Sequence, residues 1–166
     1  MSIGENFLGE LDAEMPPTRR LLERVPTDKG QWKPHEKSFA LGHLAQLVAT
    51  MPGWIPRTVG ETELNLAASA GYSFQATESL LGQFDKHVSE ARAVLAAAKD
   101  SDFSVLWSLK MGTNVLFTAP RGVVVRQHIN HLCHHRGQLT VYLRLLDVPI
   151  PSIYGPTADE KFGPPA

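Results

Sequence analysis

Four histidines occur close together late in the sequence: His128, His131, His134 and His135. On an α-helix each residue is rotated by about 100° from the one before, so His135 lies about 40° from His131, and His128 lies about 60° from it in the same direction. Imidazoles that share a helix face one turn apart can bind one metal ion. The rotation leaves both the 131/135 pair and the 128/131 pair open, because i, i+3 histidines also bind metals in helical bundles.

A third ligand has to come from another element, and His43 is the strongest candidate. It stands between Leu41 and Leu44 in a predicted apolar helix. An isolated histidine there is more often a core residue, but beside an i, i+4 pair a ligand is favoured. Three imidazoles leave a coordination position for water, as in catalytic zinc sites. A divalent ion would make water or a thiol nucleophilic at neutral pH, and zinc or nickel is the expected metal.

Neighbours of the histidines have alternative interpretations. Gln138 lies about 20° from His131 on the helix and could orient a ligand imidazole by a hydrogen bond. Arg136 could bind an anionic substrate or form a salt bridge between two helices. His128 is held in reserve as a ligand or as a hydrogen-bond partner of one, and Cys133, nearly at the back of the helix, is expected to pack as a small hydrophobe.

Three residues far from this helix are further candidates for a site at the bundle mouth. Glu14 and Tyr154 could act in acid–base chemistry or hydrogen bonding. Trp54 could form the wall of a pocket. Nothing in the sequence places any of the three beside the histidines.

Apolar spacing predicts four long helical segments, over residues 7–25, 38–51, 77–98 and about 121–147. Pro16 and Pro17 should kink or break the first, because proline removes a backbone hydrogen bond inside a helix. Ser38 and Thr77 are expected N-caps, and Pro120 should open the last helix.

The connections between these segments differ in length. A helical turn is expected to restart at Trp54, followed by a long connection over 60–75. Alternation in 105–109 and 115–117 suggests a small hairpin, with a loop that tucks Trp107 into the core as the alternative. From Val148 onward the many prolines exclude a continuous helix.

The segment 131–138 (HLCHHRGQ) resembles the His-x-x-x-His-Arg-Gly-Gln segment of the DinB-like, or YfiT-like, four-helix metalloproteins. Two further stretches fit the resemblance in the same chain order: WKPHEKS at 32–38 with LGHLA at 41–45, and PIPSIYGP at 149–156. The resemblance implies an up-down-down-up bundle, frequent homodimerisation, and a tri-histidine site.

The ligand set that the resemblance implies is His43, His131 and His135, and it selects the 131/135 pair. Characterised members of the family include metal-dependent transferases and hydrolases that act with low-molecular-weight thiols. The expected fold is therefore all-α, a single four-helix bundle over residues 1–166, with a short hairpin or loop inserted before the last long helix.

The resemblance and the residues together predict a metal-dependent transferase or hydrolase that activates water or a small thiol. The alternative is a non-catalytic metal-binding or stress-response module, since fold does not determine function. A fourth protein ligand, such as His128, would favour that module, and an open coordination position would favour the enzyme.

The composition favours a small-molecule substrate over nucleic acid as the binding partner. The formal charge is −1 with 16 Lys plus Arg against 17 Asp plus Glu, which argues against nucleic acid. The one cysteine excludes an intrachain disulfide, residues 1–15 lack a signal-peptide pattern, and no apolar run is long enough to span a membrane. A cytoplasmic protein is expected.

Homodimerisation is expected to use helix surfaces rich in small residues, which allow close approach. These residues are Gly42, Ala45, Ala49, Ala91 and Ala97.

Overall fold

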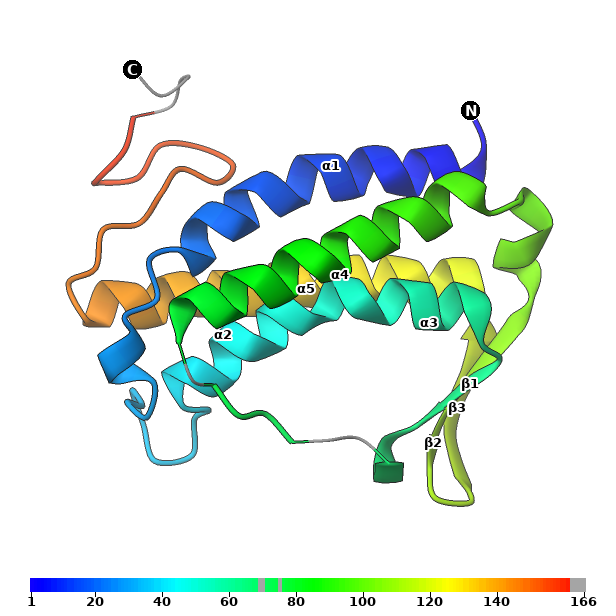
Figure 1. The fold of residues 1–166 in the computed structure, drawn as a ribbon, viewed down its shortest axis with the longest axis horizontal. Helices are drawn as coiled ribbons and strands as arrows, with labels where there is room; N and C mark the ends of the chain where they lie inside the picture. The colour runs from blue at the N-terminus through cyan, green and yellow to red at the C-terminus, as the bar shows by residue number, and fades with distance from the viewer. Residues whose placement is uncertain (69–70, 75, 162–166) are drawn as a thin grey trace.

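The computed structural model describes residues 1–68, 71–74 and 76–161, and these form a mainly helical protein (Figure 1). The helices of this part of the chain are α1 (Ile3–Leu22), α2 (Leu41–Thr50), α3 (Trp54–Gly60), α4 (Thr77–Ala97) and α5 (Arg121–Leu145). Its strands are β1 (Glu63–Asn65), β2 (Leu106–Met111) and β3 (Asn114–Pro120). Single turns of 3₁₀-helix, among them η2 (Met51–Gly53), join several of these elements.

The helices α2 and α3 form one bent limb, so the bundle has four long limbs. Pro52 lies in the turn η2 between them, where it interrupts the helix, and Trp54 restarts it as expected. In Figure 1, α1 and α5 run in one direction, while the α2–α3 limb and α4 run in the other. This is the expected up-down-down-up order, and it needs the long connection between α3 and α4 because those two limbs run in parallel.

An apolar stripe on each limb faces the bundle axis and forms one core. On α1 the stripe recurs at helical spacing through Phe7, Leu11 and Met15, which are all buried. The facing positions on the other limbs are also buried: Leu44, Val48, Ile55, Leu80, Phe84, Leu95, Ile129, Leu132, Leu139 and Leu143.

The expected helix boundaries were partly wrong. Pro16 and Pro17 do not break the first helix: α1 continues through them, because its apolar face is buried on both sides of them and the burial outweighs the lost hydrogen bonds. Neither expected cap is used: α2 begins after Ala40 rather than Ser38, and Thr77 is the first residue of α4, with its hydroxyl donating to the carbonyl of Val25 at 2.7 Å.

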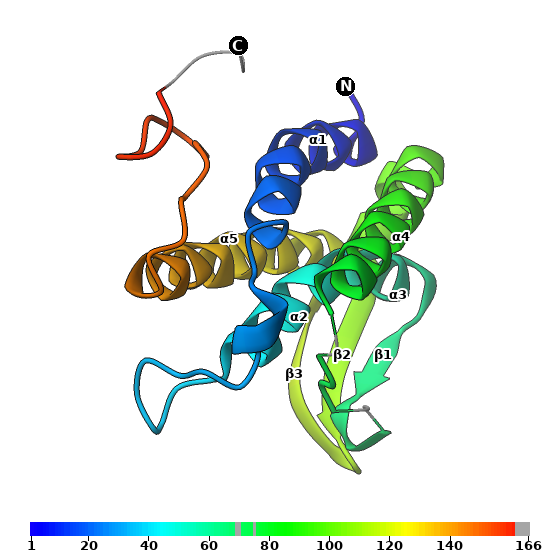
Figure 2. The ribbon, with the colours of Figure 1, turned by 60° about the vertical axis from the view of Figure 1, so that its left-hand side comes forward.

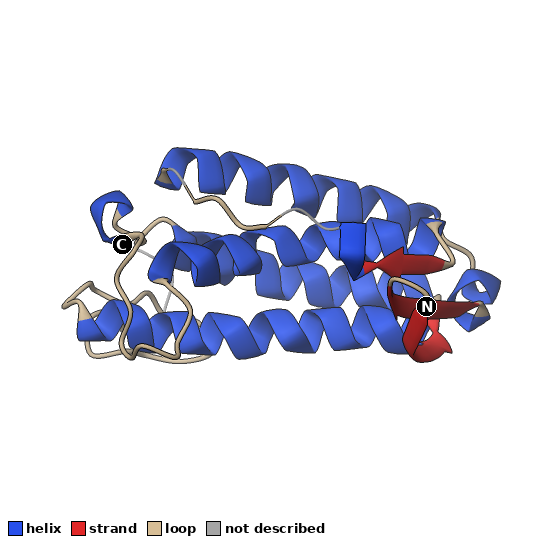
Figure 3. Cartoon of the chain, turned by 90° about the horizontal axis from the view of Figure 1, so that it is seen from below, coloured by secondary structure: helices blue, strands red, loops and turns tan. Residues whose placement is uncertain are grey.

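The chain is not all-α, because a three-stranded mixed sheet lies at one end of the bundle (Figures 2 and 3). The strands β2 and β3 form the hairpin expected from the alternating pattern, and Gly112 takes a positive φ of 61° in its turn. The strand β1 pairs in parallel with β2, with Leu64 opposite Leu109, which the sequence did not suggest. Trp107 of β2 is buried with 2% of its surface exposed and anchors the sheet to the helices.

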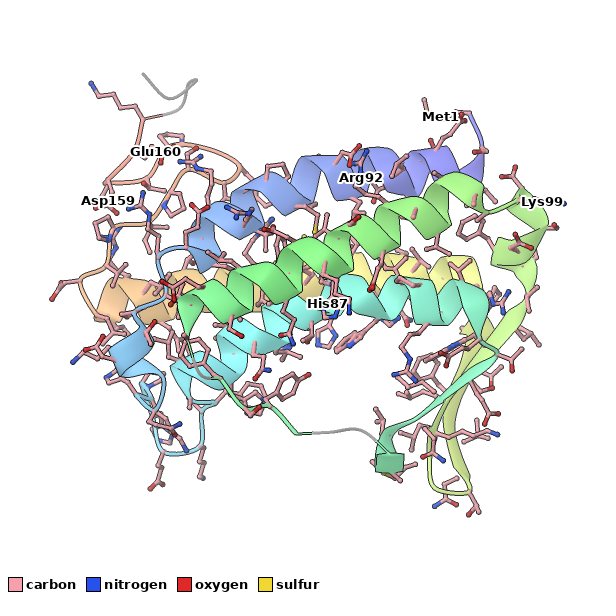
Figure 4. All side chains as sticks on the ribbon, in the orientation of Figure 1. Met1, His87, Arg92, Lys99, Asp159 and Glu160 are labelled. Carbon is pink, nitrogen blue, oxygen red and sulfur yellow. The ribbon has the colours of Figure 1, made fainter. Side chains whose placement is uncertain are left out.

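The segment after α5 folds back along the bundle without forming a helix, as far as residue 161. Two acidic residues of this segment, Asp159 and Glu160, are labelled in Figure 4. They pair with arginines of two helices, Asp159 with Arg144 and Glu160 with Arg20. The backbone N–H of Ile150 also donates to Asp159 at 2.9 Å. None of the helices within the described residues is both long enough and apolar enough to cross a membrane.

Four of the five small residues expected to form a dimer surface pack inside the protein instead. Ala45, Ala49 and Ala91 are fully buried between the helices of one chain, and a Cβ on Gly42 would approach the Phe74 ring to 2.6 Å. Ala97 is exposed. Close helix approach is therefore used within the bundle, and this surface does not supply a dimer interface.

The contact between α1 and α4 at Gly4 leads to a prediction about stability. A Cβ on Gly4 would lie 2.5 Å from the carbonyl oxygen of Leu95, a backbone atom that cannot move without shifting α4. Gly4→Ala should therefore lower the free energy of unfolding by about 1–3 kcal/mol, measured in urea. The matched control is Gly9→Ala on the same helix, where nothing lies within 4 Å and helix propensity should raise stability by about 0.5–1 kcal/mol. Equal shifts in the two variants would contradict this reading of the contact.

Candidate metal centre

The imidazoles of His131 and His135 meet on one face of α5. Their Nε2 atoms are 2.9 Å apart and their ring centroids 4.6 Å apart, which is the convergence that i, i+4 spacing predicts. His135 is buried with 8% of its surface exposed, whereas His131 is exposed. The pair therefore has one ring fixed in the protein and one facing solvent.

Gln138 determines how protons are distributed over this pair. Its Oε1 lies 2.7 Å from Nδ1 of His135 and can only accept, so Nδ1 of His135 carries a proton. In the neutral ring Nε2 of His135 is then an acceptor, and Nε2–H of His131 donates to it. The expected hydrogen bond of Gln138 to an imidazole of this helix face is confirmed, and it leaves the His135 Nε2 lone pair directed at His131.

The spacing of the two Nε2 atoms fits shared coordination of one ion. Nitrogen ligands roughly 2.05 Å from a metal lie about 2.9 Å apart at a right angle and about 3.4 Å apart at a tetrahedral angle. The separation of 2.9 Å lies at the lower end of this range. An ion held by both nitrogens would replace the hydrogen bond between them.

His43 lies beside this pair but does not complete a three-ligand group. Within the described residues no three His, Cys, Asp or Glu side chains are close enough together to hold a metal ion. The His43 ring is stacked on Phe39 at 4.4 Å and 18°, and Tyr72 covers it at 4.5 Å. Burial lowers the pKa of His43, which keeps the ring neutral and able to coordinate.

Phe39 links His43 to the pair on α5. Its ring lies 6.3 Å from that of His135 as well as against His43. The donor chemistry of the three histidines thus fits a tri-imidazole site. The Nε2 atoms of His131 and His135 already converge, whereas the third ring is stacked on Phe39.

His128 is directed away from the pair and into the protein. Its Nε2 forms a 2.9 Å hydrogen bond with the hydroxyl of Thr58, and its ring meets Trp54 and Trp107 edge-on. Burial, with a smaller contribution from the charge of His131, lowers its pKa to about 4. His128 is therefore a neutral structural residue that supports Trp54, whose other contact is with His131 at 5.8 Å.

Arg136 lies on the face of α5 that packs against α1. It is 1% exposed and pairs with Glu14 at 2.6 Å, while also donating to the Thr18 hydroxyl at 2.9 Å and to the Tyr154 hydroxyl at 2.6 Å. Of the two interpretations of Arg136, the salt bridge between helices is confirmed. Glu14 is the partner of Arg136 in this ion pair, and Tyr154 is hydrogen-bonded to Arg136. Neither residue belongs to the histidine site.

Cys133 belongs to the same polar cluster. Its sulfur lies 3.5 Å from both the Glu14 carboxylate and the Tyr154 hydroxyl. Burial raises the pKa of the Cys133 thiol, so the thiol stays protonated at neutral pH. The half-buried cysteine is thus a weak hydrogen-bonding group and not the purely apolar packing residue that was expected.

The family model of the DinB family matches residues 4–162, nearly the whole chain. The chain belongs to the DinB family. One relative of this DinB-family chain is the Bacillus subtilis (strain 168) protein named "Uncharacterized protein YrdA", which is 25% identical over 162 residues, covering 96% of this chain and 93% of the relative.

Two crystal structures share the fold of this DinB-family chain. A DinB-like protein, YjoA, from Bacillus subtilis superposes with a TM-score of 0.70 at 15% identity, covering 94% of this chain and 99% of the other. A DinB-like protein from Bacillus cereus ATCC 10987 gives the same TM-score at 20% identity, covering 90% and 97%. At this identity the likeness concerns the fold alone.

The sequence did not reveal three residues that shape the site of this DinB protein. Phe39 precedes α2 and is 44% exposed beside His43. Its i, i+4 spacing from His43 was the available signal. Tyr72 lies in the connection before α4 and Thr58 at the end of α3, and neither carries a sequence signal that would place it beside a histidine.

The lowered pKa of His128 predicts acid sensitivity of the metal-free protein. The pKa falls from 6.5 to about 4 on folding, so between these pH values the unfolded chain binds more protons. Stability should be complete above pH 6.5 and fall by about 3 kcal/mol as the pH drops toward 4. Urea unfolding at pH 7.5 and 4.5 with a chelator present measures this loss.

The control for this pH effect is His128→Gln, which keeps a side chain able to hydrogen-bond to Thr58 but cannot take up a proton. Its loss of stability between the two pH values should be smaller by most of that 3 kcal/mol. The same pH dependence in both proteins would show that His128 is not responsible.

Proposed function

We propose that this DinB-family chain binds one divalent metal ion, zinc or nickel, through His43, His131 and His135, and acts as a metal-dependent transferase or hydrolase on a small-molecule substrate. The observation that carries the proposal is the 2.9 Å approach of two Nε2 atoms, with Gln138 fixing the proton on the far side of one ring. Gln138 plays the role of the outer hydrogen-bond partner that metal-binding histidines commonly have.

The bound ion would supply a Lewis acid that makes water, or the thiol of a low-molecular-weight cosubstrate, nucleophilic at neutral pH. The protein residues would bind and orient. His135 is fixed by Gln138, while exposed His131 faces the solvent from which a substrate arrives. Trp54 and Phe39 contact these imidazoles and offer apolar surface beside them.

The contacts that His128 makes inside the protein favour an enzyme over a structural metal site with four protein ligands. A structural site needs a fourth protein ligand, and His128 was the candidate for it. Its Nε2 bonds to Thr58, and its ring is enclosed by two tryptophans. A coordination position is thereby left for water or substrate.

Metal analysis of protein purified without a polyhistidine tag tests the proposal. One zinc or nickel ion per chain, bound reversibly and displaced by a chelator, is the expected result. The affinity should fall steeply as the pH drops through the pKa values of the ligands, because protons compete for the same nitrogens. Burial lowers the pKa of both His43 and His131, so the fall should begin below the ordinary imidazole value of about 6.5. Absence of stoichiometric binding for every divalent metal tried would refute the function.

We also propose that the protein is a homodimer, since closed two-fold pairing is the commonest oligomeric arrangement. Because most of the small helix residues are buried inside the bundle, the dimer interface has to lie on another surface. Light scattering at micromolar concentration should give about twice 18.3 kDa. A mass that stays at the single-chain value as concentration rises would refute the dimer.

A further inference from the structure

The ring of Phe39 lies near both the proposed third ligand and one of the other two. It stacks on His43 with a centroid distance of 4.4 Å and lies 6.3 Å from the His135 ring. Tyr72 covers His43 at 4.5 Å and has no ring contact with His135 or His131 among the described residues. Phe39 therefore differs from Tyr72 in touching histidines of both α2 and α5.

This placement matters because three ligands of one ion must come very close together. Nitrogens bound at roughly 2.05 Å cannot lie more than about 4 Å from one another. His131 and His135 meet this limit at 2.9 Å, whereas no group of three ligands forms within the described residues. To join such a group the His43 imidazole would have to leave its present position, where it is stacked on Phe39 and covered by Tyr72.

We propose that Phe39 is a positioning residue that holds the His43 imidazole away from His131 and His135, so that the tri-histidine site closes only when the Phe39 ring moves aside. This inference rests on the proposed function, because it assumes that His43 is a metal ligand. It assigns to the ring a role in metal affinity that is separate from core packing.

The surroundings of Phe39 allow such a movement. The residue precedes the N-cap Ala40, whose backbone is extended, so the side chain is not confined by a preceding helical turn. It is 44% exposed and is not part of the buried core. Its ring stacks on that of His43, and a stacked aromatic pair is worth little enough that metal binding can displace it.

The test measures Co²⁺ affinity and the visible spectrum of the Co²⁺ complex for the full chain, so that no enzymatic activity is needed. Phe39→Ala should bind Co²⁺ about two- to tenfold more tightly than the wild type, because the stacking that opposes coordination is lost. Phe39→Tyr, which keeps the flat ring, should restore the wild-type affinity. The matched control Phe117→Ala removes a similarly exposed ring, 37% exposed on β3 and packed on Trp107, and should change nothing.

The outcomes separate this inference from the proposed function. Unchanged or weaker binding by Phe39→Ala, in a protein whose wild type binds Co²⁺, overturns the role of Phe39 and leaves the metal site standing. Equal binding by His43→Ala and wild type overturns it as well, because His43 is then not a ligand. Absence of Co²⁺ binding in every variant refutes the proposed function, and the role of Phe39 falls with it.

Discussion

Replacement of His135 by alanine is expected to lower zinc or nickel affinity by more than about 100-fold. Removing a residue that only hydrogen-bonds to a metal ligand usually costs about 10- to 100-fold in affinity, and removing the ligand itself should cost more. His135 should be the most sensitive position, since its ring is buried and its Nε2 lone pair is already directed at the second ligand. His131→Ala and His43→Ala should also abolish stoichiometric binding. Isothermal titration calorimetry of chelator-treated protein measures these losses.

The sequence provides the matched control for this experiment. His134 adjoins His135 on the same helix and its ring lies 5.0 Å away, but it is exposed and shares no hydrogen bond with the pair. His134→Ala should bind metal as the wild type does, and circular dichroism should show similar helical content in all variants. Gln138→Leu should give an intermediate loss of about tenfold. Full metal content in His135→Ala would contradict the proposed ligand set.

The part of the site that could be predicted from the sequence lies within one helix. Rotation of about 100° per residue is enough to bring His131, His135 and Gln138 together, and the structure confirms their contacts. The position of the His43 ring could not be obtained in this way. It depends on Phe39 and Tyr72, which belong to irregular segments whose path is determined by tertiary packing.

The same distinction, between contacts within one helix and contacts between elements, explains the errors in the predicted fold. Periodicity located the four helical limbs, because burial repeats every three or four residues along each of them. It could not show that α1 would run through Pro16 and Pro17, since the compensating contacts come from other helices. Nor could it show β1, a strand of only three residues that exists because β2 offers it an edge.

Arg136 is a case in which tertiary contacts decide between two interpretations of one residue. In the sequence it follows His135 directly, and a role in binding an anionic substrate was reasonable. On the helix, however, Arg136 lies toward α1, where Glu14, Thr18 and the Tyr154 hydroxyl use its guanidinium donors. Its charge is already neutralised and buried, which makes it a link between α1, α5 and the C-terminal segment.

Arg136→Met is therefore expected to destabilise the protein by about 3–5 kcal/mol, the usual cost of breaking a buried ion pair from one side. The substitution preserves much of the side-chain volume but leaves the Glu14 carboxylate, 17% exposed, with only hydroxyl and thiol partners. Tyr154→Phe removes the hydroxyl that accepts from Arg136 and donates to Glu14, and because this group lies at the edge of the cluster its loss should cost less, about 1–2 kcal/mol. Urea unfolding at pH 7.5 measures both.

The double variant Arg136→Met with Glu14→Gln separates the ion pair from simple packing. If the loss arises from an unpaired buried carboxylate, neutralising Glu14 should recover a large part of it, and the two changes should be strongly non-additive. Metal affinity of the Arg136→Met protein, measured under conditions where it is folded, should match the wild type, because the ion pair faces α1 and the histidine pair does not. Additive losses in the double variant would show that Arg136 stabilises the bundle through its aliphatic stem and not through its charge.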